Sequence, residues 1–397
     1  MVKLSRRLDQ VIESQTLAMT KMARELKEQG KDIISLSIGE PDFDTPENIC
    51  EAAFTAMKAG QTHYPPVLGT IDFRKAISDK LNRENGLNYS TEQIIVSSGA
   101  KHSLINAVLA LINEGDEVLM PAPFWVSYPS MVTYAGGKSV IVPSKAENGY
   151  KVTAAELESH ITDKTRLIIF SSPCNPSGSV MSQGELASWV KVLEKYPDIF
   201  ILSDEIYEKI NYVGKHVSIA SFPSMKNRVA VINGLSKGYA MTGWRIGYLA
   251  GPVELVKACE KIQGLYTSGA NSVAQAAGIE ALTGNQDSVE SMRQVFEKRR
   301  NLMHELLSAI PGIQNINPDG AFYHFPDVSA FLGKSFGDKV IVSADDLCLY
   351  LLEHAEVSTV SGAAFGSPNC IRLSYATSEE NIEKAITRIS KALSQLN

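Results

Sequence analysis

The segment SKGYAMTGWRIGY, from Ser236 to Tyr248, places a lysine and an arginine in a glycine-rich turn directly after an apolar run. A lysine amine has a pKa of about 10.4 in water, so it is a poor nucleophile unless a pocket lowers that pKa or a carbonyl group captures it. Lys237 therefore indicates a covalent link to an aldehyde, and the planar donor fork of Arg245 suits a phosphate. Pyridoxal phosphate is the common cofactor that carries both groups. The alternative is two solvated surface cations, since lysine and arginine are mostly exposed.

Size and composition narrow the class of protein. The chain has 397 residues, of which 44% are hydrophobic and 21% charged, enough for a large core and more than one ordinary domain holds. The net charge of -6 and the lack of a long lysine or arginine run argue against nucleic acid as a partner. We find no membrane-spanning run and no targeting pattern, and therefore expect a cytoplasmic protein that acts on small molecules.

The cysteines and histidines show no sign of a disulfide framework or a metal centre. Five cysteines are scattered without a CxxC pair, and an odd number cannot all pair within one chain, so we expect reduced thiols. The seven histidines form no HExxH or similar motif. We therefore expect catalysis without a metal.

Short β-rich runs alternate with helical patterns from Gln93 to Ala250, which predicts an α/β fold with a mostly parallel central sheet sandwiched by helices. The expected strands are 94–97, 117–120, 139–142, 166–170, 199–202, 229–232 and 245–249, and 100–112 is an expected helix. Several of these runs lack strict alternation, as strands covered on both faces do.

The pattern changes after Ser288, which predicts a second, smaller α+β domain. A charged helical stretch, 289–310, is followed by the turn residues Pro311 and Gly312. An apolar strand-like run at 33–38 precedes the loop GEPDFDTP and is expected to join this domain. We therefore expect an arm at 1–14, a small domain from 15–45 and 289–397, and a large domain at 46–288.

Polar residues that follow the expected strands are candidate ligand contacts, because ligands collect beyond the carboxyl ends of strands in such sheets. The stretch from Ser98 to Lys101 opens a helix, whose free N–H groups could hold a phosphate, although a tight turn is the alternative. Asn175 lies in the loop SSPCNPSG, where a turn asparagine is the alternative. Asp204 and Tyr207 share one side if the chain turns helical, and the alternative is a helix cap beside a core tyrosine.

Together these strand-end residues supply what a pyridoxal ring requires. Asp204 would keep the ring nitrogen protonated, so that electrons released at a substrate α-carbon can flow into the ring. Tyr207 and Asn175 could bond the ring hydroxyl oxygen, and Trp125 in PAPFWVSYP could stack on the ring face. The alternative for a tryptophan is a place in the core.

The motifs resemble those of class I aminotransferases of pyridoxal phosphate fold type I, in particular the bacterial aspartate aminotransferase subgroup. The resemblance covers nearly the whole chain and is carried, in the order the subgroup shows, by SIGEPDFDTP, HYPP, PFWVSYP, CNPSG, SDEIYE, SKGYAMTGWRIGY, GAFY and IRLSYATSEEN. It implies ping-pong transamination by pyridoxal 5'-phosphate, with L-aspartate and 2-oxoglutarate giving oxaloacetate and L-glutamate.

The resemblance also implies a role for each site residue. Lys237 anchors the cofactor and then moves protons as general acid and base. The phosphate is held by Arg245, Ser236, Gly99, Ala100 and Lys101, the ring by Asp204, Tyr207, Asn175 and Trp125, and the substrate α-carboxylate by Gly39 and Arg372, with Trp125 and Asn175 also touching substrate. The alternative for Arg372 is a structural salt bridge. Tyr64 would reach the cofactor of the neighbouring subunit, which implies a homodimer with shared active sites.

Substrate choice is less closely defined by the sequence. In the subgroup, Lys101 with the hydroxyls of Ser14 and Thr16 is associated with dicarboxylic substrates, and a surface lysine is the alternative. Prephenate, which carries the same two carboxylates, and aromatic amino acids remain alternative substrates. A carbon-sulfur lyase of the same fold is a further alternative, because the electron sink is shared. A cofactor-binding transcription regulator is not favoured, since no basic helix-turn-helix pattern precedes the resemblance.

Overall fold

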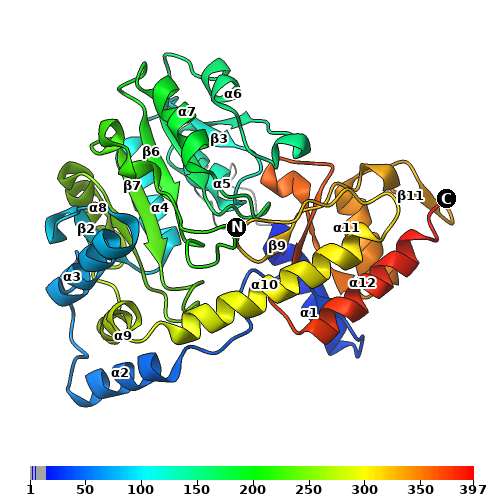
Figure 1. Ribbon diagram of the computed structural model, residues 1–397, viewed down its shortest axis with the longest axis horizontal. Coiled ribbons are helices and arrows are strands. Elements are labelled where there is room, and N and C mark those ends of the chain that lie inside the picture. Colours follow the sequence, from blue (N-terminus) through cyan, green and yellow to red (C-terminus); the bar gives the residue numbers. More distant parts are fainter. Residues whose placement is uncertain (1, 3–4, 6–14) are drawn as a thin grey trace.

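The computed structural model describes residues 2, 5 and 15–397, apart from the side chains of 15–18 and 20. Its centre is a seven-stranded sheet with the strand order β2-β8-β7-β6-β5-β3-β4 (Figure 1). The strands are β2 (Ile94–Ser97), β3 (Glu117–Pro121), β4 (Lys138–Val142), β5 (Thr165–Ser171), β6 (Phe200–Asp204), β7 (Val229–Gly234) and β8 (Gly247–Ala250). Strand β8 runs antiparallel to the other six strands, which are parallel to one another. The expected mostly parallel sheet and its strands are therefore confirmed, with ends shifted by a few residues.

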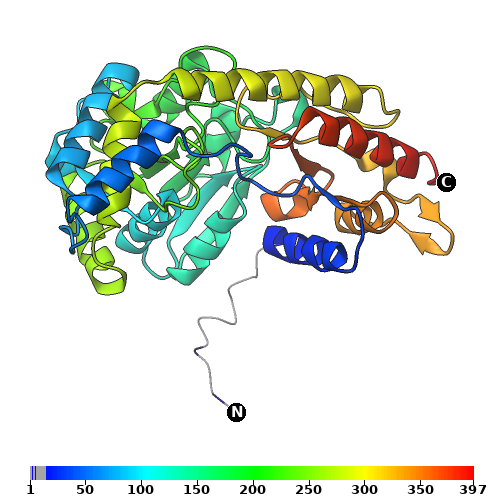
Figure 2. The ribbon, with the colours of Figure 1, turned by 90° about the horizontal axis from the view of Figure 1, so that it is seen from below.

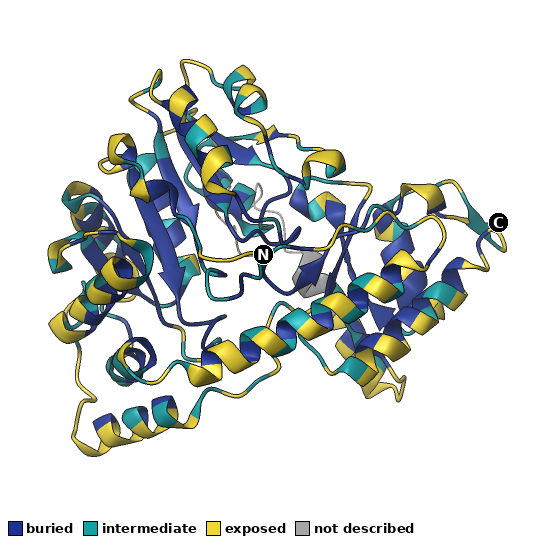
Figure 3. Cartoon of the chain, viewed as in Figure 1, coloured by how far each residue is buried: buried dark blue, intermediate teal, exposed yellow. Residues whose placement is uncertain are grey.

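Helices cover both faces of this sheet, because successive strand residues point to opposite sides. Ile95 packs into one core, whereas Ile94 and Val96 pack into the other. The first core holds α4 (Ala100–Leu111), α5 (Ser127–Tyr134) and α8 (Val253–Tyr266); the second holds α2 (Glu47–Lys58), α3 (Ile71–Lys80), α6 (Ala154–Ser159), α7 (Gln183–Leu193) and α9 (Ser272–Thr283). Figure 3 shows the strands of the sheet in the colour of buried residues, as expected for apolar runs without alternation.

A second, smaller unit forms around another core. Its helices are α1 (Gln15–Glu28), α10 (Asp287–Ser308), α11 (Ala344–His354) and α12 (Glu379–Leu393). Its strands are β1 (Ile34–Ser35), β9 (Tyr323–His324), β10 (Ser335–Phe336), β11 (Lys339–Val340), β12 (Val357–Ser358), β13 (Val360–Ser361) and β14 (Ile371–Ser374). Figures 1 and 2 show α10 reaching from the large sheet to α12. The strand expected within 33–38 is short, because β1 pairs in parallel with β12 over two residues.

Two further expectations concern the chain as a whole. None of the five cysteines forms a disulfide, so the thiols are free as expected. Within the described ranges, no helix combines the length and the apolar character that crossing a membrane requires.

The sheet gathers the polar segments at one edge. Strands β2, β3, β5, β6 and β7 run in the same direction, so the residues that follow them emerge on the same side. Strand β8 runs the opposite way, and therefore Arg245, which precedes it, joins the same edge. The small unit lies against this edge and contributes Arg372 from β14. The fold thus brings together residues that lie far apart in the sequence.

Candidate active site

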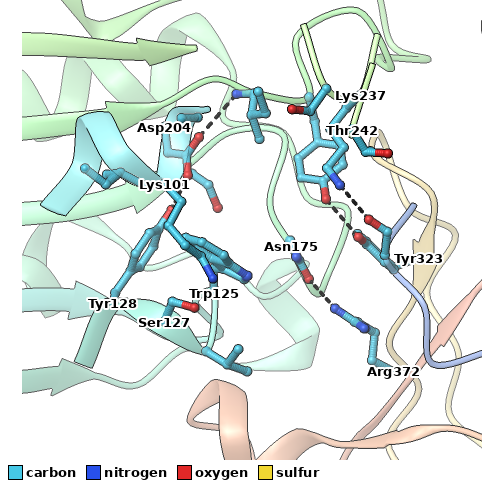
Figure 4. A pocket seen from close by; sticks show the side chains of 18 of the residues that line it. Lys101, Trp125, Ser127, Tyr128, Asn175, Asp204, Lys237, Thr242, Tyr323 and Arg372 are labelled. Carbon is cyan, nitrogen blue, oxygen red and sulfur yellow. Dashed lines mark hydrogen bonds between the residues drawn. The ribbon is translucent and has the colours of Figure 1, made fainter. Parts of the chain in front are cut away.

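A cavity of about 310 Å³ lies at this edge, between the large sheet and the small unit. Figure 4 shows side chains from both units pointing into it. Most of the residues predicted for the site line this cavity, namely Gly39, Ala100, Lys101, Trp125, Asn175, Asp204, Tyr207, Ser236, Lys237, Arg245 and Arg372. The chain therefore builds one pocket from motifs that were singled out separately in the sequence.

One end of the cavity is built to receive an anion. Helix α4 begins here, and no side chain caps its N-terminus, which leaves the positive end of the helix open. Arg245 and Lys101 are exposed beside it, and neither forms an ion pair with any residue that the structure describes. Although part of the Lys101 side chain reaches water, the protein around its amine withdraws solvent from it, and this desolvation together with the charge of Arg245 lowers the pKa of Lys101. These positive groups face one another with no negative charge between them, which is the arrangement that a bound phosphate would stabilise.

Backbone conformation and two glycines shape the same end. Arg245 has φ of 53°, in the left-handed region that costs a non-glycine residue about 1–3 kcal/mol. Its Nη1 donates to the carbonyl of Thr242 at 2.8 Å, which holds the guanidinium in place. A side chain at Gly99 would collide with Arg245 Nη2, and one at Gly247 would collide with the backbone nitrogen of Ala100. The close approach of these segments therefore requires glycine at both positions.

Lys237 lines the cavity in a partly buried position. Its Nζ donates to the carbonyl oxygen of Gly39 at 2.5 Å. Burial lowers its pKa to about 8, and the positive charges of Arg372 and Arg245 act in the same direction. Far more of this amine is therefore neutral near physiological pH than of a lysine in water, and the neutral form is what a nucleophile and proton carrier requires.

Asp204 ends β6 and is 5% exposed. Its Oδ2 accepts from the hydroxyl of Tyr128 at 2.7 Å, and its Oδ1 accepts from the backbone N–H of Ile206 at 3.3 Å. Burial raises the pKa of Asp204 to about 6, while the hydrogen bond from Tyr128 opposes the rise. The carboxylate is thus ionised at neutral pH and able to accept a proton donor placed in the cavity.

Tyr128 also shapes the wall beside Asp204. Its ring packs edge-on against Trp125, with centroids 5.6 Å apart, and Lys101 Nζ lies 4.8 Å from the centre of the Trp125 ring (Figure 4). The half-buried indole is therefore held between a phenol and a cation at the cavity wall. It is not part of the deep core, which was the alternative for a tryptophan.

The opposite wall carries a pair of phenols. The hydroxyls of Tyr207 and Tyr323 lie 2.8 Å apart, and both side chains are buried. Burial raises the pKa of Tyr207 well above its ordinary value, as does its contact with Tyr323. A side chain at Gly39 would collide with the Tyr323 hydroxyl. Tyr323 therefore links the large unit to the small unit at the site.

Arg372 is 2% exposed yet has no acidic partner among the residues that the structure describes. Its Nη1 donates to Asn175 Oδ1 at 3.0 Å and its Nη2 to the carbonyl of Ser37 at 2.6 Å, while its Nε has no partner within the described chain. Its guanidinium also lies 4.5 Å from the centre of the Tyr323 ring. A buried guanidinium without a counter-ion is costly, so a structural salt bridge does not explain it and a ligand carboxylate would.

Some predicted residues are not brought to the cavity of this chain. Tyr64 is 95% exposed and does not line it. Gly99 lies against Arg245 just behind the lining. Ser14 lies outside the described residues, and so does the side chain of Thr16.

Sequence reasoning missed five polar residues that line the cavity, namely Ser127, Tyr128, Ser171, Thr242 and Tyr323. Tyr128 lies three positions after Trp125, a spacing that places both on one side of a helical turn. Tyr323 belongs to the GAFY motif, but its contact with Tyr207 spans 116 positions and no local pattern predicts it. Thr242, between Lys237 and Arg245, also faces the cavity, where its hydroxyl contacts Glu40.

Comparison with known proteins places the chain in a family. The model of a family described as aminotransferase class I and II matches residues 31–389. The chain is 47% identical over 394 residues to a probable aspartate/prephenate aminotransferase from Rhizobium leguminosarum bv. phaseoli, with 98% of each chain covered. It is 46% identical over 391 residues to an aspartate aminotransferase from Bacillus sp. (strain YM-2), again with 98% of each covered.

Solved structures give the same result. The crystal structure of the aspartate aminotransferase from Rhizobium meliloti matches with a TM-score of 0.97 and 42% identity over 100% of both chains. The aspartate aminotransferase from Thermus thermophilus with maleate matches with a TM-score of 0.93 and 38% identity over 99% of this chain and 100% of that one. The expected fold type is therefore confirmed, and the chain belongs to the class I and II aminotransferases.

Proposed function

We propose that this enzyme is a pyridoxal 5'-phosphate-dependent aspartate aminotransferase, which transfers the amino group of L-aspartate to 2-oxoglutarate and yields oxaloacetate and L-glutamate. The observation that carries the proposal is Lys237, whose pKa is lowered to about 8 in a cavity between an anion-binding end and the unpaired guanidinium of Arg372. The names of the relatives support aspartate as a substrate.

The residues present fit this cofactor at four points. The open N-terminus of α4 with Arg245, Lys101 and Ser236 suits its phosphate, in space that side chains at Gly99 and Gly247 would fill. Asp204 would face the ring nitrogen, Tyr207 and Asn175 the ring hydroxyl, and Trp125 the ring face. When bound, pyridoxal 5'-phosphate supplies an aldehyde that takes up an amino group and a ring that withdraws electrons from the substrate α-carbon.

The chain's own residues would perform the remaining tasks. Arg372 binds the substrate α-carboxylate through its planar donors, which fixes the α-carbon near Lys237. The neutral amine of Lys237 would act as the base that removes the proton from that carbon. Once protonated, it would act as the acid that donates the proton later in the reaction. Ionised Asp204, held by Tyr128, keeps a proton on the ring nitrogen. Each task corresponds to a charge state that burial or a partner already favours.

For the side-chain carboxylate of the substrate, we propose Lys101 with the hydroxyls of Ser14 and Thr16. Lys101 lines the cavity and has no acidic partner within the described part of the chain. The Thermus thermophilus structure with maleate supports a site for two carboxylates. Prephenate carries the same two groups, and the name of the Rhizobium leguminosarum relative includes it, so prephenate is the second candidate substrate.

We also propose a homodimer in which Tyr64 reaches the partner's cofactor. Its 95% exposure in the single chain supports this, because a large aromatic side chain is costly to leave in water. We propose further that the large domain comprises 46–288 and that the small domain comprises 15–45 and 289–397, with 1–14 as an arm. The separate cores of the two units support this division.

The first experiment mixes the cofactor-loaded enzyme with L-aspartate alone and follows both the cofactor absorbance and oxaloacetate. We expect the absorbance to convert to that of the aminated cofactor, with one oxaloacetate for each site. Unchanged absorbance would exclude aspartate as the amino-group donor, and aromatic amino acids would then be the next donors to test. Pyruvate and ammonia released from cystathionine would instead indicate a carbon-sulfur lyase.

The proposed role of Lys101 has its own test. With the cofactor at saturation, we expect Lys101→Ala to raise the KM for aspartate by about tenfold or more, while the KM for an uncharged amino acid changes much less. A weakened phosphate site would affect both substrates equally, whereas the loss of a charge pair affects only the dicarboxylate. Lys58→Ala, an exposed lysine on α2 that packs over Phe54, is the matched control. Equal effects on both substrates would contradict the assignment.

A further inference from the structure

A buried polar cluster lies directly behind Asp204. Glu205 is the next residue, and it is 0% exposed. Its Oε1 accepts from the hydroxyls of Ser203 at 2.8 Å and Ser218 at 2.6 Å. Its backbone N–H donates to the carbonyl of Ile232 on β7 at 2.8 Å, which ties the residue to the sheet. Asp204 therefore faces the cavity while its neighbour is anchored in the protein interior.

His216 completes the surroundings of Glu205. Its side chain is 6% exposed, and its Nε2 lies 2.9 Å from Glu205 Oε2. The two atoms are within ion-pair distance, although their alignment is poor for a hydrogen bond, and Nδ1 has no partner among the described residues. A buried imidazole at this distance from a buried carboxylate is most stable when it carries a proton and a positive charge.

Charge balance leads to the same conclusion. Four ionisable side chains in the cluster are at most 7% exposed, and they are Glu205, Glu208, Lys80 and His216. Lys80 contacts Glu208, which also accepts from Asn85 at 3.0 Å. Two carboxylates thus face a single ammonium group, and an uncompensated buried charge is strongly destabilising. Protonation of His216 makes the four groups neutral as a set.

The turn that follows β6 connects this cluster to the cavity. The backbone N–H of Glu208 donates to the carbonyl of Glu205 at 3.0 Å, which closes the turn that carries Tyr207. Tyr207 points to the cavity from this turn, and Asp204 does so from the strand end before it. The position of both therefore depends on where Glu205 is held.

We propose that Glu205 and protonated His216 form a positioning pair, which holds the end of β6 so that Asp204 and Tyr207 face the reaction site. Neither side chain lines the cavity, so the pair acts through its neighbours. A divalent cation is the competing occupant, because one ligand atom each from Glu205, Glu208 and His216 lie within 4.8 Å of one another. Lys80 argues against it, since its ammonium already contacts Glu208 and would repel a metal.

The pair has a defined dependence on pH. His216 faces Glu205 and Glu208 from the turn after β6 and Lys80 from α3, with Lys209 and Glu84 further out and the phenols of Tyr89, Tyr239 and Tyr248 near the carboxylates. Burial and Lys80 lower the pKa of His216, but Glu205 and Glu208 outweigh them and raise it above 6.5. The stability from this pair is therefore complete below the unfolded value of about 6.5 and is lost as pH rises through the folded pKa.

A titration by nuclear magnetic resonance tests the charge state in the cofactor-free protein. We expect the His216 ring, assigned with His216→Asn, to titrate above 6.5, and Glu205→Gln to lower that value by about one unit or more. A wild-type value at or below 6.5, or no change in Glu205→Gln, would contradict the pair. A shift of the His216 signals by micromolar Zn²⁺ would show that a metal, not a proton, completes the cluster, and would also overturn the proposal.

Kinetics test the positioning role and rest on the proposed function. We expect His216→Asn and Glu205→Gln each to lower kcat by about tenfold, with the KM for aspartate within about threefold, because Arg372 is untouched. The double variant should recover part of kcat at high pH, since two amides can hydrogen-bond without charge, and its melting temperature should no longer depend on His216 ionisation. Glu353→Gln, which removes the exposed partner of His354 at 3.9 Å, is the matched control.

The two tests separate the possible failures. Lower melting temperatures with unchanged kcat and pH profile would show a purely structural pair and contradict the positioning role. No aspartate turnover in the wild-type enzyme would contradict the proposed function, while the titration of His216 would still decide the charge state of the pair.

Discussion

Two lysines in this protein lie away from water but in opposite electrostatic surroundings. Lys80, on α3, is 1% exposed and is surrounded by Glu208, Asn85 and, at 3.6 Å, Glu84. Lys237, in the cavity, has one hydrogen bond to a carbonyl and two nearby guanidinium groups, and burial lowers its pKa to about 8. In the first region every buried charge has an opposite charge beside it. In the second, Lys237, Arg245 and Arg372 form no ion pair with any residue that the structure describes, and the charges of Glu40 and Asp204 offset the loss of water around Lys237 only in part.

The difference separates stability from reactivity within one domain. A buried ion with partners holds the surrounding elements together, and removing one partner is expensive. A buried amine without a carboxylate loses its proton more easily, which weakens the fold slightly but makes the group a better base and nucleophile. Burial raises the pKa of Glu208, but the charges of Lys80, His216 and Lys209 outweigh it and draw that pKa down to about 2, so this carboxylate remains charged.

The largest expected effect follows from removing the reactive lysine. Lys237→Ala should lower turnover by at least about 10³-fold while the fold is retained, because it removes the proposed anchor and proton carrier but breaks no ion pair among the described residues. Turnover with aspartate measures the loss of activity, and the melting temperature measures whether the fold is retained. Near wild-type turnover would contradict the assignment.

The pH dependence of stability provides a control for the same variant. A lysine with a lowered folded pKa binds its proton more weakly in the folded state, so unfolding takes up a proton between about pH 8 and the unfolded value of 10.5. Wild-type stability should therefore rise relative to Lys237→Ala across that window. A constant difference would show that the pKa of Lys237 is not lowered.

The opposite pattern is expected for Lys80→Met. This change should lower the free energy of unfolding by about 3–5 kcal/mol, because Glu208 is left as an unpaired buried anion, while kcat per folded enzyme changes by less than about threefold. Chemical denaturation and active-site titration measure both. Lys75→Met, on the same helix and exposed beside Asp79, should cost less than about 1 kcal/mol. A large fall in kcat per folded enzyme with little loss of stability would contradict the proposed difference between the two lysines.

Tyr128→Phe sharpens the description of the reactive region. It removes the hydroxyl that donates to Asp204 at 2.7 Å, so the pKa of Asp204 should rise further above about 6. We expect the acid limb of the pH–rate profile to move to higher pH by about one unit and kcat at pH 7 to fall by about tenfold. Tyr134→Phe, on the same helix and outside the cavity, should leave the profile unchanged.

The smallest effect is expected from Glu84→Gln. Glu84 is 23% exposed, lies 3.6 Å from Lys80 and accepts from Lys209 at 2.8 Å. Lys80 keeps Glu208 in this variant, so the loss should be about 0.5–1 kcal/mol by chemical denaturation. A loss as large as that of Lys80→Met would mean that Glu84, rather than Glu208, neutralises the buried ammonium.

Most of the residues that line the cavity could be predicted from the sequence, because their motifs follow or precede recognisable strands. Lys237, Asp204, Asn175 and Arg245 each adjoin a strand at the same sheet edge, so recognising the strands was enough to bring them together. The observed strand ends differ from the predicted ones because they depend on how far pairing with a neighbouring strand extends. For example, β1 is shorter than predicted because it pairs with β12 over two residues only.

Other parts of the site could not be predicted from local patterns. The hydroxyl contact between Tyr207 and Tyr323 and the donation from Lys237 to Gly39 join segments 116 and 198 positions apart. The phenol of Tyr128 reached Asp204 across 76 positions because α5 packs on the sheet. Such contacts depend on how the two units meet, and no spacing rule within one segment encodes that.

Gly99 and Gly247 have a practical consequence for anyone who re-engineers this enzyme. Atoms added at either position would strike Arg245 or the first N–H of α4, so the anion-binding end exists because the chain omits side chains there. A mutant library that varies only charged and polar residues would never sample the loss of this space. Replacement of Gly99, whose added atoms would meet the end of the Arg245 side chain, should instead weaken phosphate binding in proportion to side-chain volume while every charge stays in place.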